Sequence, residues 1–198
     1  MRVLLTRHGE TKENKKGVLQ GWLPGHLSAK GKEQAKLLGK KLSDVKIDRV
    51  YTSDLSRCYN TALEILKKHP KTKLIKDRLL RERNLGDFEG KKVKLSDWEV
   101  LPGNLYTNRP KGGETFEEVW ERMNKFYKKL KRVSSSKTVL IVGHGGSQIL
   151  LQGIIQKFSL KKSFNLPVLE NTAITEIDLN KKGISKMIKI NCKEHLKK

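Results

Sequence analysis

The sequence has 198 residues, 36% of them hydrophobic and 6% aromatic, which indicates one globular domain with a charged surface. No apolar run approaches the length of about 18 residues that a membrane span requires, which excludes a protein with helical membrane spans. The net charge of +22 indicates either an anionic partner or a simple preference for lysine.

The basic residues give little support to nucleic-acid binding. Lysine supplies 33 of the 43 basic residues, and these are scattered without the interleaved aromatic residues that stack on single strands. We therefore expect the charge to reflect composition. The two cysteines, Cys58 and Cys192, form no metal-type or redox-type pair, which favours a reduced, cytoplasmic location as the default.

Strands and helices alternate over the first part of the chain. The apolar run at 2–7 predicts a core strand, because it is too short for a signal peptide and no cleavage site follows. Ser28 predicts the N-cap of a helix that runs to about Leu42. Further strands are predicted over 47–52 and 73–76, separated by a helix through Leu55, Ala62, Leu63 and Leu66.

Residues 77–114 differ from this pattern, because they are charged, contain glycine and show no sustained periodicity. We expect this irregular stretch to form a substrate pocket or lid. Thr115 and Glu118 then predict a capping box for an amphipathic helix to about Val133. After it we expect a strand over 138–142, a helix over about 147–156, and β segments over 172–179 and 184–190 joined by a turn at 180–183.

This alternation predicts an α/β fold in a single domain over residues 1–198. We expect a three-layer α/β/α sandwich with a mostly parallel sheet and an antiparallel edge formed by the last two segments. In such sheets, ligands bind beyond the carboxyl ends of the strands. The residues that follow the predicted strands are therefore the candidates for a functional site.

Two of the predicted strands end in the same His-Gly pair. His8 and Gly9 follow the first strand, and His144 and Gly145 follow the strand over 138–142. Each glycine allows a sharp turn that exposes backbone N–H groups. We expect both histidines to lie at one rim of the sheet, although 136 positions separate them, and we interpret the pair as a functional site.

Two arginines belong to the same predicted rim. Arg7 precedes His8, and Arg57 lies near the start of the helix that follows the second strand. The planar guanidinium group donates two parallel hydrogen bonds to a phosphate, and a helix N-terminus adds a favourable field for an anion. Together with two imidazoles, these residues predict a pocket for a tetrahedral dianion.

These segments resemble the histidine phosphatase (phosphoglycerate mutase-like) superfamily, in the right order and over nearly the whole chain. The matching segments are Arg7-His8-Gly9-Glu10-Thr11 with Asn14, Gln20-Gly21-Trp22, Leu27-Ser28 with Gly31 and Gln34-Ala35, Ser53 to Arg57, Arg81-Glu82, Gly112 to Thr115, Gly143 to Gly145, and Asn171-Thr172.

The resemblance implies a phosphoglycerate mutase-like fold and a role for each site residue. His8 would be the nucleophile that forms a phosphohistidine, neutral at one ring nitrogen and fixed by a hydrogen bond from the other to backbone. Glu82 would protonate the leaving oxygen; an exposed carboxylate paired with neighbouring arginines is the alternative. The phosphoryl group would be bound by Arg7, Arg57 and His144, and the substrate oriented by Asn14, Gln20, Gly21 and the Gly145 backbone.

The superfamily contains both hydrolases and mutases. Residues 83–90 resemble the glycine-aromatic-Glu-Gly pattern of the hydrolases, whereas mutases carry a tyrosine shortly after the acid, where Leu85 stands here. A phosphomonoesterase acting on small phosphorylated metabolites is therefore favoured, and a phosphoglycerate mutase is the alternative. Phe88, Trp98 and Tyr106 fit an apolar pocket wall or an anchor for the loop equally well.

Other classes of protein fit the sequence less well. It has neither the histidine spacing of a metal hydrolase, nor the Gly-x-Ser-x-Gly of a serine hydrolase, nor a nucleotide-binding glycine loop. We expect no metal, no cofactor and no membrane partner. A non-enzymatic binder of anions or nucleic acid is the least favoured alternative, and a homodimer stays open. The remaining histidines, His26, His69 and His195, are predicted to lie on the surface.

Overall fold

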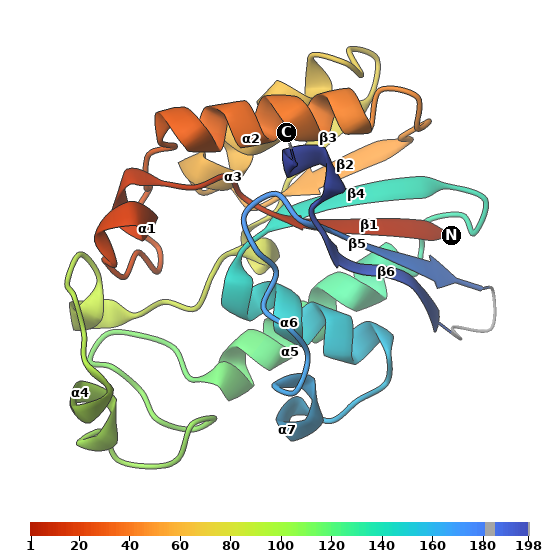
Figure 1. The fold of residues 1–198 in the computed structure, drawn as a ribbon. Helices are drawn as coiled ribbons and strands as arrows, with labels where there is room; N and C mark the ends of the chain where they lie inside the picture. Colours follow the sequence, from red (N-terminus) through yellow and green to blue (C-terminus); the bar gives the residue numbers. More distant parts are fainter. Residues whose placement is uncertain (181–184, 198) are drawn as a thin grey trace.

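In the computed structural model, which describes residues 1–180 and 185–197, six strands form one sheet in the order β3-β2-β4-β1-β5-β6 (Figure 1). Strands β3, β2, β4 and β1 are parallel, whereas β5 is antiparallel to β1 and to β6. The strands are β1 Arg2–Arg7, β2 Arg49–Thr52, β3 Lys73–Lys76, β4 Thr138–Gly143, β5 Ile174–Leu179 and β6 Ser185–Cys192. The predicted fold class, mostly parallel with an antiparallel edge, is confirmed.

Helices cover both faces of this sheet (Figure 1). On one face lie α2 (Ala29–Lys41) and α3 (Ser56–Leu66), and on the other lie α5 (Phe116–Leu130) and α6 (Gly145–Ile155). The short helices are α1 (Lys12–Lys16), α4 (Leu95–Glu99) and α7 (Leu160–Ser163), with 3₁₀ turns at Arg78–Leu80, Gly86–Phe88 and Glu194–Leu196. In the part of the chain that the structure describes, no helix is long and apolar enough to cross a membrane.

The central strands are apolar on both sides because they separate two cores. From β1, Val3 and Leu5 contribute to the core shared with α5 and α6, whereas Leu4 contributes to the core shared with α2 and α3. Successive side chains of a strand point to opposite faces, so a continuous apolar run fills both cores. Strand β4 repeats the pattern with Val139 and Ile141 on the first side and Leu140 and Val142 on the second.

Most predicted elements are present, with shifted ends. The strand predicted from residue 47 begins at Arg49, the helix predicted to Val133 ends at Leu130, and the helix predicted from 147 begins at Gly145. Helices α1, α4 and α7 were not predicted, because helices of four or five residues are too short for a periodic pattern. Of the predicted turn, residues 181–183 lie outside the described residues.

One of the three surface predictions for histidines is wrong. His26 has an exposed side chain and His195 is half-buried, but His69 is only 9% exposed. The His69 ring hydrogen-bonds to the backbone at Leu42, at the end of α2, because the chain after α3 folds back against that helix. Its position after a predicted helix gave no sign of this contact.

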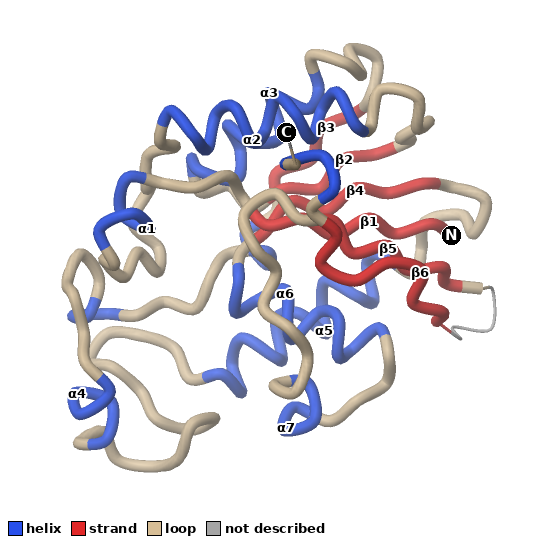
Figure 2. The backbone as a smooth tube through the Cα atoms, in the orientation of Figure 1, coloured by secondary structure: helices blue, strands red, loops and turns tan. Residues whose placement is uncertain are grey.

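The carboxyl ends of the parallel strands meet at the end of the sheet where α1, α4 and the loops between β3 and α5 gather (Figure 2). The start of α2 lies directly on the loop that follows β1. Ser28 caps α2 by accepting from the Gly31 amide at 3.0 Å, and its own amide donates to the Glu10 carbonyl at 2.9 Å. A Cβ atom added to Gly31 would overlap with the Glu10 carbonyl oxygen.

We expect Gly31→Ala to destabilise the protein by about 1–3 kcal/mol, because the added methyl group must displace backbone. In an unconstrained helix the same change stabilises by up to about 1 kcal/mol, so the sign of the effect is diagnostic. Urea unfolding measures it, with Lys32→Ala at the exposed neighbouring position as the control. Equal or greater stability of Gly31→Ala would show that this close approach does not constrain the loop.

Candidate active site

The pairing of β1 with β4 brings the two predicted histidines together. Arg7 is paired with Gly143 at the ends of the strands, and the His8 amide then donates to the Gly143 carbonyl at 3.0 Å. The rings of His8 and His144 lie edge to face, with centroids 5.4 Å apart. The prediction that both histidines share one rim of the sheet is confirmed.

Three hydrogen bonds fix the His8 ring and its backbone. Nδ1 of His8 lies 2.8 Å from the Gly9 carbonyl oxygen, and because a carbonyl only accepts, Nδ1 carries a proton. In the neutral ring, the lone pair is therefore on Nε2. The Gly9 amide donates to Thr61 Oγ1 at 3.0 Å, and Asn171 Nδ2 donates to the His8 carbonyl at 2.8 Å.

Arg57 connects the second histidine to the loop before α2. Its Nε donates to His144 Nδ1 at 3.2 Å, which leaves the proton of the neutral His144 ring on Nε2. Its terminal nitrogens donate to the carbonyl oxygens of Gly21 at 2.7 Å and Leu23 at 2.6 Å. Only 1% of Arg57 is exposed, so these bonds hold the guanidinium group in one orientation.

The guanidinium group of Arg7 has an N–H donor that no described residue accepts from. Its Nη1 donates to the Leu169 carbonyl at 3.3 Å, but its buried Nε has no hydrogen-bond partner among the described residues. A buried unpaired donor is costly, and an anion in the adjacent cavity would satisfy it. Burial lowers the pKa of both Arg7 and Arg57 from the ordinary value of a guanidinium group.

The two arginines also affect the imidazoles. Burial, and then the charges of Arg57 and Arg7, lower the pKa of His8 well below its ordinary value of 6.5. The pKa of His144 is lowered for the same reasons, burial first and the Arg57 charge second. Both rings are therefore neutral at pH 7.

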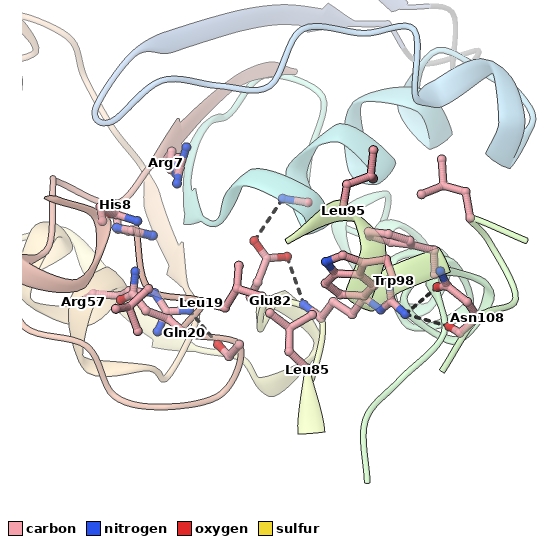
Figure 3. A pocket seen from close by; sticks show the side chains of 17 residues that line it. Arg7, His8, Leu19, Gln20, Arg57, Glu82, Leu85, Leu95, Trp98 and Asn108 are labelled. Carbon is pink, nitrogen blue, oxygen red and sulfur yellow. Dashed lines mark hydrogen bonds between the residues drawn. The ribbon is translucent and has the colours of Figure 1, made fainter. Parts of the chain in front are cut away.

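The carboxylate of Glu82 lies at the N-terminus of α6. It is not the exposed carboxylate paired with neighbouring arginines that was the alternative interpretation. Its carboxylate oxygens accept from the Gly146 and Arg83 amides at 3.0 Å each (Figure 3). They also accept from the Ser147 amide at 3.0 Å. Helix N-terminal amides favour a negative group. The Glu82 carbonyl is held as well, by Trp22 Nε1 at 2.8 Å.

A cavity of about 460 Å³ contains most of the predicted site residues (Figure 3). His144 and Gly145 are not among the residues that line it; His144 is fully buried, and Gly145 lies beside the Arg7 guanidinium. The predicted residues that do line it are Arg7, His8, Asn14, Gln20, Gly21, Arg57 and Glu82.

Sequence reasoning missed two positioning contacts. Arg122 forms an ion pair with Glu114, Nε to Oε1 at 3.0 Å, and donates to backbone carbonyls within 79–82, so it fixes the turn that carries Glu82. Thr61 holds the Gly9 amide. Both side chains come from helices that are distant in sequence from the site residues they position. The sequence indicated only the partner of Arg122, because Glu114 belongs to the Gly112 to Thr115 segment that resembles the family.

The aromatic residues left open by the sequence have separate positions. Trp98 lines the cavity, and Phe88 packs edge-on against it with ring centroids 4.9 Å apart. Tyr106 packs against Phe164 at 5.3 Å and is not among the lining residues. Trp98 is therefore part of the pocket wall, and Phe88 packs against it from outside the cavity lining. Across residues 1–180 and 185–197, no group of three or more His, Cys, Asp or Glu side chains is arranged to hold a metal ion.

Comparison with known proteins agrees with this geometry. Residues 3–192 match the family model described as histidine phosphatase superfamily (branch 1). A protein of Schizosaccharomyces pombe named as a probable phosphatase is 32% identical over 191 residues, which cover 92% of this chain and 89% of that protein. A 2,3-bisphosphoglycerate-dependent phosphoglycerate mutase of Rhizobium rhizogenes is 34% identical over 157 residues, 73% of this chain and 74% of the mutase.

The solved structures give the same result. Bacillus stearothermophilus YhfR superposes with a TM-score of 0.88 at 29% identity, and the match covers 99% of each chain. The family match, the curated relatives and the fold thus coincide with the paired histidines at the carboxyl ends of β1 and β4. The chain belongs to the histidine phosphatase superfamily.

Proposed function

We propose that the protein hydrolyses phosphate monoesters through a phosphohistidine formed on Nε2 of His8. The observation that carries this proposal is the hydrogen bond from His8 Nδ1 to the Gly9 carbonyl, which leaves the lone pair on Nε2. His8 lines the cavity together with Arg7 and Arg57. A neutral imidazole beside two guanidinium groups is suited to attack the phosphorus of a bound dianion.

In the first step, the Nε2 lone pair of His8 bonds to phosphorus while the bond from phosphorus to the ester oxygen breaks. The leaving oxygen takes a proton from the Glu82 carboxyl group, so an alcohol departs and phosphohistidine remains. In the second step, a water molecule gives a proton to the Glu82 carboxylate while the oxygen of that water bonds to phosphorus. The bond from phosphorus to His8 Nε2 breaks in the same step, and inorganic phosphate leaves.

The remaining residues bind and orient the phosphoryl group in this proposal. Arg7 and Arg57 donate to its oxygens and oppose the charge that develops on them in the transition state. His144 acts through its hydrogen bond with Arg57, which holds the guanidinium group. The substrate is further oriented by Asn14, Gln20, Gly21 and the amide of Gly145 at the start of α6.

Hydrolysis is favoured over a mutase reaction by the wall opposite His8. A mutase must hold a second anionic position of its substrate, whereas Leu85 lines the cavity here. Arg109, the arginine of the irregular segment that could bind such a group, instead donates to Glu118 at 2.7 Å and to the Gly113 carbonyl, and it is not among the lining residues. Water is then the available acceptor of the phosphoryl group.

We expect the protein to hydrolyse p-nitrophenyl phosphate in an excess of chelator, because the proposed chemistry uses only side chains. His8→Ala should lower kcat/KM by at least about 10³-fold, since it removes the nucleophile. The control is His26→Ala, at an exposed histidine. Turnover that disappears with chelator and returns with a metal ion, or that persists in His8→Ala, would contradict the proposal.

Glu82→Gln should lower kcat/KM for methyl phosphate by about 10²–10⁴-fold, because an alkoxide needs a proton to leave. The loss should be smaller for p-nitrophenyl phosphate, whose leaving group departs as a stable anion. Steady-state kinetics on both esters measures the difference, and Glu121→Gln, at an exposed carboxylate of α5, is the control. Equal losses for the two esters would exclude Glu82 as the proton donor.

We expect the His8 ring to stay neutral, with its proton on Nδ1, well below pH 6.5, because burial and two guanidinium charges lower its pKa. Below pH 6.5 the His8 ring of the unfolded chain binds a proton that the folded protein does not bind. The free energy of unfolding therefore decreases as the pH falls below 6.5, by up to about 1.4 kcal/mol per pH unit. Nitrogen NMR titration, assigned with His8→Gln, tests this. A titration midpoint at or above 6.5 would contradict it.

A further inference from the structure

The cavity has two chemically different ends. His8, Arg7 and Arg57 lie at one end, Leu95 and Trp98 lie at the other, and Glu82 lies between them (Figure 3). The apolar residues that line the cavity are Val18, Leu19, Leu85, Leu95, Trp98, Leu105 and Phe116. A bound monoester with its phosphoryl group at His8 must therefore place its alcohol part against apolar side chains.

Two of these apolar residues have largely exposed side chains. Leu95 is 75% exposed and Leu105 is 51% exposed, although both line the cavity. Large apolar side chains exposed around a concave site mark a surface that a ligand covers. The part of a substrate that reaches them would bury its own apolar area and theirs.

Arg83 is a cation that lines the cavity beside these apolar residues, and its donors are used within the protein. Arg83 Nη2 donates to the Asn108 carbonyl at 2.7 Å and to Asn108 Oδ1 at 2.9 Å, and its Nε donates to the Glu114 carbonyl at 2.7 Å. The guanidinium carbon also lies 4.4 Å from the ring centroid of Phe116 and 5.2 Å from that of Trp98. Arg83 is 2% exposed, so it supports the wall from within.

A second anionic group on the substrate would be poorly accommodated here. Beyond the phosphoryl position it would meet apolar side chains such as Leu85 and Trp98, and the polar residues at this end, Arg83 and Asn108, are already hydrogen-bonded to each other. An anion loses hydration in apolar surroundings without compensation. Sugar acids and bisphosphates, whose alcohol parts carry such groups, do not match this end of the cavity.

We propose that the site selects phosphate monoesters with an uncharged, apolar alcohol part, aryl-substituted or branched alkyl, which lies between Trp98 and the exposed Leu95 and Leu105. This inference rests on the proposed phosphatase function and adds the class of substrate. Burying one phenyl or comparable alkyl group is worth about 1.5–3 kcal/mol, which corresponds to a preference of roughly 10- to 200-fold.

The test compares esters of primary alcohols, so that the leaving groups are chemically similar. We expect kcat/KM for 2-phenylethyl phosphate to exceed that for 3-phosphoglycerate by at least about tenfold. The ratio of kcat/KM for 2-phenylethyl phosphate to that for methyl phosphate should fall about fivefold or more in Leu95→Ser and in Trp98→Ala. This ratio is independent of the fraction of each variant that is folded. Leu95→Ser changes an exposed residue, so it keeps the test valid if Trp98→Ala folds poorly.

Val100→Ser is the matched control, because Val100 is 80% exposed close to α4 but is not among the lining residues. Its ratio should equal that of the unaltered protein. Hydrolysis of all three esters without preference, or an unchanged ratio in Leu95→Ser, would overturn the inference while leaving the phosphatase function intact. Hydrolysis of p-nitrophenyl phosphate but of none of the three esters would overturn the inference alone, whereas no hydrolysis of any of the four would overturn the proposed function as well.

Discussion

The parallel, in-register pairing of β1 with β4 is the constraint on which the site depends. Arg7 is paired with Gly143, and the residue after each of them is a histidine. The two histidines therefore leave the sheet side by side at the carboxyl ends of the two strands. The backbone bond from His8 to the Gly143 carbonyl extends this register one residue beyond the strands. Helix α6 begins immediately afterwards, so its N-terminal amides face the same space and hold Glu82.

Charge is separated within this space. Burial, and then the charges of the guanidinium groups, lower the pKa of both imidazoles. The amides of α6 hold the Glu82 carboxylate between the positive end and the apolar wall. Each group is fixed by contacts from distant segments: Arg57 by the carbonyls of Gly21 and Leu23, and the turn of Glu82 by Arg122. In the proposed function, this arrangement holds an anion at one end and an apolar group at the other without rearrangement.

The sequence was informative where function follows the ends of regular strands. His8 and His144 could be predicted to meet because apolar runs of β type precede both, and Glu82 could be assigned only through the family resemblance. Trp98 could be proposed for the wall only as one of two alternatives, and the supporting role of Arg83 could not be predicted, because both act through contacts between irregular segments that leave no periodic pattern. The placement of His144 behind the cavity surface likewise depends on side-chain packing with Arg57.

The central claim is that phosphorus bonds to His8 during turnover. Mixing the protein with p-nitrophenyl phosphate, quenching in base within one turnover and mapping the phosphate by mass spectrometry tests it directly. The account predicts acid-labile phosphate on Nε2 of His8, which is absent in His8→Ala. Phosphate trapped on another residue, or trapped equally in His8→Ala, would contradict the account.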